Sequence, residues 1–217
     1  MSNLADTPLA LLLRRLWDLM LLNFLCIICS LPIITIGASI SAMYSVSMKI
    51  TRWDSTPVIK GFFIAFKENF LQATLLGLIV IIPTVMAAGD ILFALANPGI
   101  MQTVFLIVGC IVGLIALIFL VNSFVLQANY KNTLKGHLIN SLLVAAANPV
   151  KFLLCIVCWA VPWALFVLIP EYFMMKLGAA YLMWGISGPG YLTVLLLKGV
   201  FDKIRKEDKE NPPENEI

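Results

Sequence analysis

Four long stretches without a charged residue constrain the fold of this chain most strongly. They cover residues 69–89, 101–126, 152–170 and 177–197. A helix of about 20 apolar residues is long enough to cross the roughly 30 Å hydrocarbon core of a lipid bilayer. Each stretch therefore predicts one membrane-spanning helix.

The overall composition points to the same class of protein. Of the 217 residues, 61% are hydrophobic and only 12% are charged, which leaves too little polar surface to cover a soluble globule. A transmembrane barrel would instead show alternating segments of about ten residues, and the sequence has none. We therefore predict an all-α, polytopic transmembrane helical bundle. The net charge of +3 is small, so nucleic-acid binding is not expected.

The N-terminal apolar run is longer than one crossing requires. Residues 19–48 contain no charged residue and would extend about 45 Å as a single helix. Two shorter helices fit between Leu16 and Met48 if the chain turns near Pro32, because proline disfavours helix at the residue before it. The second helix, within residues 31–52, is rich in Gly, Ala and Ser, which allow close helix packing in lipid. This hairpin gives about six crossings, whereas one span over 16–36 gives five.

The basic residues favour six crossings over five. Lys and Arg in short loops stay on the cytoplasmic side of a membrane. Six crossings with both termini in the cytoplasm leave only Lys176 of the 15 Lys and Arg residues outside. Five crossings would also place Arg14 and Arg15 outside, so the sequence predicts a multi-pass protein with both ends in the cytoplasm.

Two connecting segments on the cytoplasmic side have the pattern of amphipathic interfacial helices. Residues 56–70 carry aromatic side chains on one helical face, and residues 133–147 place Leu134, Leu138, Leu142 and Ala145 in a similar way. The second segment ends at Asn148-Pro149, a pair typical of a helix start. We expect a partner protein to contact the aromatic face and the basic residues before it, namely Phe62, Phe63, Phe66, Phe70, Lys49 and Arg52. Residues 1–201 then form one transmembrane domain, and 202–217 form a charged tail that we expect to be disordered.

A polar site within the membrane is the main candidate for binding a solute. Asp90 and Asp18 are the carboxylates closest to membrane depth, where ionisable groups often mark substrate or ion pathways, and Asp90 follows about twenty apolar residues. Gly188, Pro189 and Gly190 interrupt the last span, and broken helices form substrate sites in transporters. Asn122, like Asn23 and Gln127, has the polarity for hydrogen bonds between helices. An exposed loop acid at Asp90 and a packing kink at the glycines are the alternative interpretations.

The cysteines form two C-x-x-C pairs, Cys26 with Cys29 and Cys155 with Cys158. Four thiolates are a familiar zinc or redox set, but that interpretation requires the two pairs to face each other. Both pairs lie in apolar helices, which favours neutral thiols used for packing. His137 is the only histidine, and the sequence has neither a phosphate-binding loop nor an H-E-x-x-H pair. We therefore predict no catalytic residues, metal ligands or cofactor.

Several short motifs resemble a known family. They are L-P-I-I-T-I-G-A at 31–38, the run ending at Lys49, F-F-I-A-F-K-E-N-F at 62–70, Asn148-Pro149 and G-P-G-Y at 188–191. Together they resemble the YesL family of bacterial integral membrane proteins over nearly the whole chain. The resemblance implies a plasma-membrane protein that is often encoded beside sugar importers of the ABC type.

Two functions follow as expectations. The first is a non-enzymatic accessory or regulatory subunit for carbohydrate uptake, with the lipid bilayer and the importer's permease subunits as partners. The second is an autonomous small-solute transporter or channel that uses Asp90 and the broken last helix. The sequence predicts neither the solute nor an oligomeric state.

Overall fold

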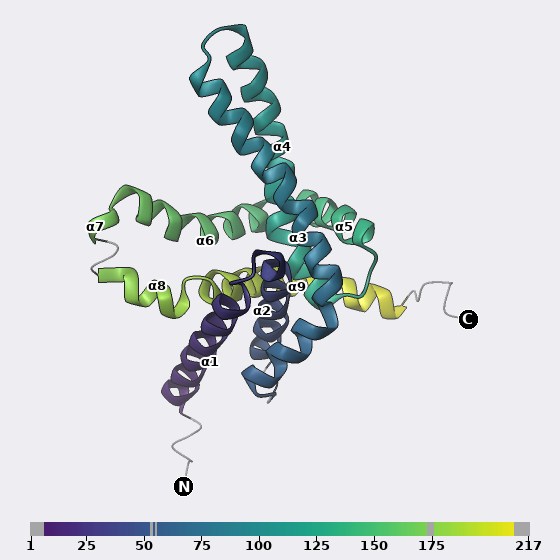
Figure 1. Cartoon of the computed structure of the whole chain (residues 1–217). Helices are drawn as coiled ribbons and strands as arrows, with labels where there is room; N and C mark the ends of the chain where they lie inside the picture. Colours follow the sequence, from purple (N-terminus) through teal and green to yellow (C-terminus); the bar gives the residue numbers. More distant parts are fainter. Residues whose placement is uncertain (1–6, 53, 55, 173–175, 211–217) are drawn as a thin grey trace.

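The computed structural model describes residues 7–52, 54, 56–172 and 176–210, and over that part the chain is helical without strands (Figure 1). The predicted all-α class is confirmed. In chain order the helices are α1 (Pro8–Cys29), η2 (Ile33–Thr35), α2 (Ile36–Thr51), α3 (Val58–Ala96), α4 (Ile100–Asn129), α5 (Leu134–Ala147), α6 (Pro149–Leu168), α7 (Pro170–Tyr172), α8 (Gly178–Trp184) and α9 (Ser187–Glu210).

The predicted N-terminal hairpin is confirmed. Helix α1 ends at Cys29, and the chain reverses before α2 begins at Ile36. The side chain of Thr35 closes the turn, because its hydroxyl donates to the carbonyl oxygens of Cys29 at 2.6 Å and Pro32 at 2.7 Å. Backbone groups that proline and the turn leave without helical partners are thus satisfied locally.

The small residues of α2 allow it to pack closely against α3. A Cβ atom at Gly37 would collide with the carbonyl oxygen of Ala73, and it would lie 3.3 Å from the Cα of Gly77. Ala38 and Ala42 are fully buried on the same helix. The close approach predicted from the Gly, Ala and Ser content of residues 31–52 is therefore present.

Helix α3 is one continuous helix of 39 residues, about 58 Å long. The aromatic segment 56–70 was predicted as a separate interfacial helix, and this is corrected, because Val58 to Ala96 contains no break. The α1–α2 turn meets α3 near Gly77, so residues 77–96 run about 30 Å further. With the antiparallel α4 they form a two-helix projection (Figure 1). We call residues 81–96 and 100–116 the α3–α4 arm.

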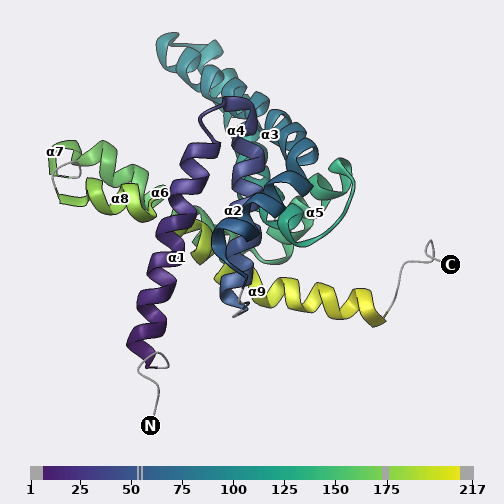
Figure 2. The ribbon, with the colours of Figure 1, turned by 60° about the horizontal axis from the view of Figure 1, so that its bottom comes forward.

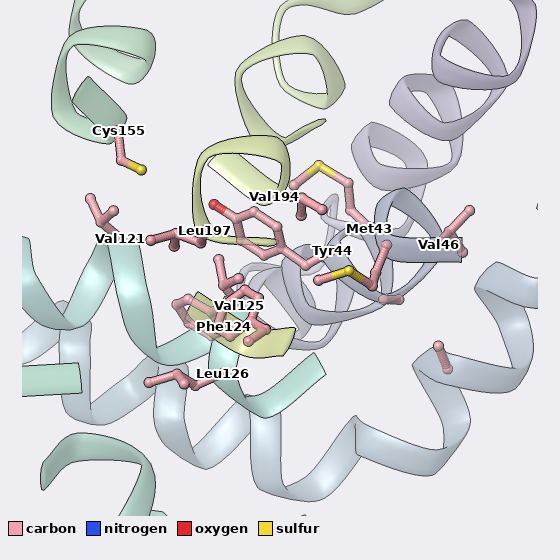
Figure 3. Packing of buried hydrophobic residues seen from close by; sticks show 14 of the residues in the cluster. Met43, Tyr44, Val46, Val121, Phe124, Val125, Leu126, Cys155, Val194 and Leu197 are labelled. Atoms are coloured by element: carbon pink, nitrogen blue, oxygen red, sulfur yellow. The ribbon is translucent and has the colours of Figure 1, made fainter. Parts of the chain in front are cut away.

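The core lies where the helices meet, below this arm (Figure 2). Seven consecutive residues of α4, 121–127, are buried, which requires neighbours on every side of the helix. Tyr44 from α2, Phe62 from α3 and Phe201 from α9 are fully buried in the same cluster, part of which Figure 3 shows. The hydroxyl of Tyr130 donates to the carbonyl oxygen of Phe201 at 2.7 Å and joins α9 to the end of α4.

The C-terminal third contains the predicted helix entry and the predicted break. Helix α5 ends at Ala147 and Pro149 opens α6 after Asn148. Helices α8 and α9 meet at an angle of 53° around Gly185. Helix α9 continues to Glu210, so the first part of the predicted disordered tail, 202–217, is helical, and residues 211–217 lie outside the described part.

Four helical segments of the described chain are long and apolar enough to cross a membrane, and the bent pair α8–α9 makes a fifth if it acts as one span. These four are Ile33–Thr51, Val58–Ala96, Ile100–Asn129 and Pro149–Leu168. Helix α1 is not among them, since every 18-residue window within it contains Arg14, Arg15 and Asp18. The sixth crossing and the orientation of the termini stay predictions.

Candidate functional site

The break between α8 and α9 is held by α1. Asn23 of α1 is fully buried, and its Nδ2 donates to the carbonyl oxygen of Leu182 at 2.7 Å. Its Oδ1 accepts the backbone N–H groups of Ile186 and Ser187, both at 2.9 Å. The hydroxyl of Ser187 in turn donates to the carbonyl oxygen of Leu19 at 2.8 Å. Polar backbone groups that a solute would need at this break are therefore already bonded to protein.

A small polar group lies beside the break, among α2, α6 and α9. Trp159 Nε1 donates to Thr193 Oγ1 at 3.2 Å, and Thr193 Oγ1 donates to the carbonyl oxygen of Pro189 at 2.9 Å. Figure 3 shows the ring of Tyr44 reaching from α2 across α9, with its hydroxyl end toward the side on which Cys155 lies. Gly190 packs against Met43, and a Cβ there would lie 2.5 Å from the Cε of Met43, so the end of that side chain would have to shift.

A cavity of about 360 Å³ opens next to this group, between α2, α4 and α6. Its lining is almost entirely apolar: Ile40, Tyr44, Leu117, Leu120, Val121, Ile156, Trp159 and Ala160. A sugar needs several hydrogen-bond partners in its site. This lining suits an apolar group and not a carbohydrate.

The parts of the predicted polar site do not come together. Asp90 lies in the α3–α4 arm beside Gly109, where a Cβ on the glycine would be 3.1 Å from the Cβ of Asp90. Asn122 lies in the core, thirteen residues further along α4, which is about 20 Å of helix. Gly188 and Gly190 pack against Trp184 and α2. The prediction of one site that joins Asp90, Asn122, Gly188, Pro189 and Gly190 is corrected accordingly.

The α4–α5 contact contains a polar layer that the sequence analysis did not predict as a unit. Ser123 and Ser141 share a hydrogen bond of 2.8 Å between their hydroxyls, and Asn122 Nδ2 donates to the carbonyl oxygen of Ser141 at 3.4 Å. Gln127 and His137 are 3% and 1% exposed in the same contact. Burial lowers the pKa of His137 below its ordinary value of 6.5.

Helix α5 buries both polar and apolar residues, so its predicted apolar face is corrected in part. His137, Ser141, Val144 and Ala145 are buried and Leu134 and Leu138 pack partly against the core, while Leu142 is exposed. Asn122 and Ser123 on α4 hydrogen-bond to Ser141 of this face. The spacing of Ser141 four residues after His137 was the signal in the sequence for a polar inward face of α5.

The predicted partner-contact residues divide into buried and exposed groups. Phe62 is fully buried, which is a correction, while Phe63 and Phe70 are 43% and 40% exposed. Phe66 packs between Phe62 and Phe70, with ring centroids 6.0 and 5.5 Å away. Arg52 Nη2 lies 3.9 Å from an oxygen of Asp202 and links α2 to α9. Lys49 is half-buried and lines a cleft that α1 shares.

The two cysteine pairs do not form a four-thiolate set. All five cysteines have free thiols, with Cys26 and Cys155 buried and Cys110 exposed. In the described part of the chain, no three His, Cys, Asp or Glu side chains are placed to hold a metal ion together. Cys26 and Cys155 belong to the buried hydrophobic cluster of the core.

Comparison with known proteins gives one match. The chain is similar over residues 19–91 to a family whose model is described as a protein of unknown function, DUF624. No curated protein and no solved structure matches the chain. The matched residues contain the second half of α1, all of α2 and α3 as far as Ile91, which includes the Gly37 contact, the exposed Phe63 and Phe70 and part of the arm.

Proposed function

We propose that this chain is a non-enzymatic accessory or regulatory subunit in the bacterial plasma membrane, bound to the permease of a carbohydrate importer of the ABC type. The resemblance to the YesL family supports the carbohydrate context, because YesL proteins belong to the family matched over residues 19–91. The docking role rests on the structure of the spanning helices.

The observation that carries this proposal is the small share of the spanning helices that the chain itself covers. In the most apolar 18-residue stretch of each spanning helix, 17% of the residues of α3 and of α4, and 12% of those of α6, are buried inside the chain. In the span Ile33–Thr51, which contains α2, the share is 56%. The arm buries mainly small residues between its two helices, such as Ala87, Ala94 and Gly109. Its large apolar side chains point outward to lipid or to another protein.

An exposed aromatic strip marks where a partner would bind. Phe63, Phe70 and Leu71 lie near the start of α3, before its close contact with α2 at Ala73 and Gly77, and Leu71 is 73% exposed. Aromatic side chains dominate the binding energy at protein interfaces because they bury a large area with few rotatable bonds. We place the permease contact on this strip.

The separated polar groups favour this function over the autonomous transporter. A solute pathway needs polar groups in sequence along it. Asp90 lies beside Gly109, which is about 20 Å from Asn122 along α4. Asn23 binds two backbone N–H groups and one carbonyl oxygen of the broken helix. Docking requires none of these groups.

Copurification from native membranes tests the proposal. A tagged full chain should retain importer permease subunits, and the double variant Phe63→Ala/Phe70→Ala should lose most of them. Phe24→Ala is the matched control, since Phe24 is 42% exposed but lies on α1. Permease capture that Phe24→Ala weakens equally would contradict the assigned surface. Sugar uptake by the purified chain in liposomes, abolished by Asp90→Asn, would instead establish the transporter.

A further inference from the structure

A cleft of about 290 Å³ lies between the N-terminal half of α1, the end of α2 and the start of α3. Helix α1 contributes Arg14, Arg15 and Asp18, and α2 contributes Lys49. Asp54 and Thr56 of the α2–α3 connection complete the polar wall. Two helices, α1 and α2, thus bring three basic side chains to one concave site.

The basic groups outnumber the carboxylates in this cleft. Asp54 is engaged by its own loop, because its Oδ1 accepts the backbone N–H of Thr56 at 3.0 Å and the Thr56 hydroxyl at 2.8 Å. Asp18 lies close enough to Arg14 to interact with its charge. One positive charge remains in excess, and two of the three basic groups are guanidinium forks, which match the oxygens of a phosphate.

The remaining lining residues of the cleft are apolar or proline: Leu11, Val46, Ile50, Pro57 and Val58. A cleft lined by both cations and aliphatic groups suits a phosphate that carries an organic group. The cleft also contains the three charged residues of α1, Arg14, Arg15 and Asp18, which the predicted topology puts at the cytoplasmic boundary of the membrane. Anionic headgroups concentrate at this boundary in the predicted orientation.

We propose that this cleft binds a phosphate group, carried either by an anionic phospholipid or by a soluble phosphate compound. Arg14, Arg15 and Lys49 contact the phosphate oxygens, and the aliphatic residues cover the organic part. Asp18 and Asp54 limit the net charge of the cleft. The proposal does not depend on the docking function, since the aromatic strip lies on α3.

Binding to the full chain in lipid nanodiscs tests this inference. The probes are phosphatidylglycerol in a phosphatidylcholine background, counted by native mass spectrometry, and inorganic phosphate, titrated by calorimetry. Removal of one cleft charge by Arg14→Gln or Lys49→Gln should weaken binding about fivefold. Lys60→Gln is the matched control, because Lys60 is an exposed lysine of α3 outside the cleft.

A second variant separates charge effects from folding effects. Asp18→Asn removes a negative charge from the cleft and should strengthen binding about fivefold. Retention of phosphatidylglycerol alone assigns the site to a phospholipid, and binding of inorganic phosphate extends it to soluble compounds. The inference is overturned if neither probe binds above phosphatidylcholine, or if Lys60→Gln weakens binding as much as Lys49→Gln.

Discussion

Asn23→Ala should destabilise the fold more than any other single amide substitution in the chain. The side chain makes three hydrogen bonds to the backbone at the α8–α9 break, and all three are lost together. Hydrogen bonds between membrane helices average about 0.6 kcal/mol, and a buried polar group left unpaired costs about 1–3 kcal/mol. The free energy of unfolding should therefore fall by about 2 to 6 kcal/mol.

Reversible unfolding in mixed detergent micelles measures this loss. Asn69→Ala is the matched control, since the Asn69 amide donates only to the carbonyl oxygen of Ala65 in its own helix, at 3.0 Å. That variant should change the unfolding free energy by less than about 0.5 kcal/mol. Equal losses for the two variants would refute the role of Asn23 in holding the break.

Three further predictions concern packing, protonation and thiol burial. Gly37→Ala should destabilise the chain by about 1–3 kcal/mol in the same unfolding assay, because the new methyl group meets the Ala73 carbonyl. Gly89→Ala should be neutral or stabilising, because a Cβ at Gly89 would have no neighbour within 4 Å outside the adjacent helix backbone. The His137 pKa is lowered in the folded state, so this group should cost no stability above pH 6.5, and the free energy of unfolding should fall as the pH drops below that value. His137→Gln should flatten this pH dependence, and a variant with an unchanged pH profile would contradict the prediction. In detergent, N-ethylmaleimide should modify the exposed Cys110 before the buried Cys26 and Cys155, as mass spectrometry of partly labelled chains would show, and early labelling of Cys155 would refute the core packing.

Local features of the sequence predicted the N-terminal hairpin and the break in the last helix. Pro32 divides an apolar run that is too long for one span, and the glycines between 185 and 190 weaken a helix wherever it packs. The small residues around Gly37 predicted close packing, because backbone approach depends on side-chain size alone. These signals act over a few residues, so the sequence is sufficient to find them.

The inward faces of the helices were harder to predict. Lipid is as apolar as a protein core, so the sequence does not show which leucines of α5 face the core: Leu138 packs against it and Leu142 is exposed. Phe62 was assigned outward for the same reason. The buried His137 and Ser141 were not predicted on the inward face. The partners of Asn23 lie about 160 residues away in sequence, and only the fold brings them together.

Photo-crosslinking in native membranes tests the docking function most directly. A benzophenone side chain in place of Phe70 puts the probe on the exposed strip of α3, and the same probe in place of Phe24 serves as the control on α1. We expect illumination to join the Phe70 probe to one importer permease subunit, identified by mass spectrometry, and the Phe24 probe to lipid. Adducts with lipid alone from both positions would contradict the assignment of this chain as a permease-bound subunit.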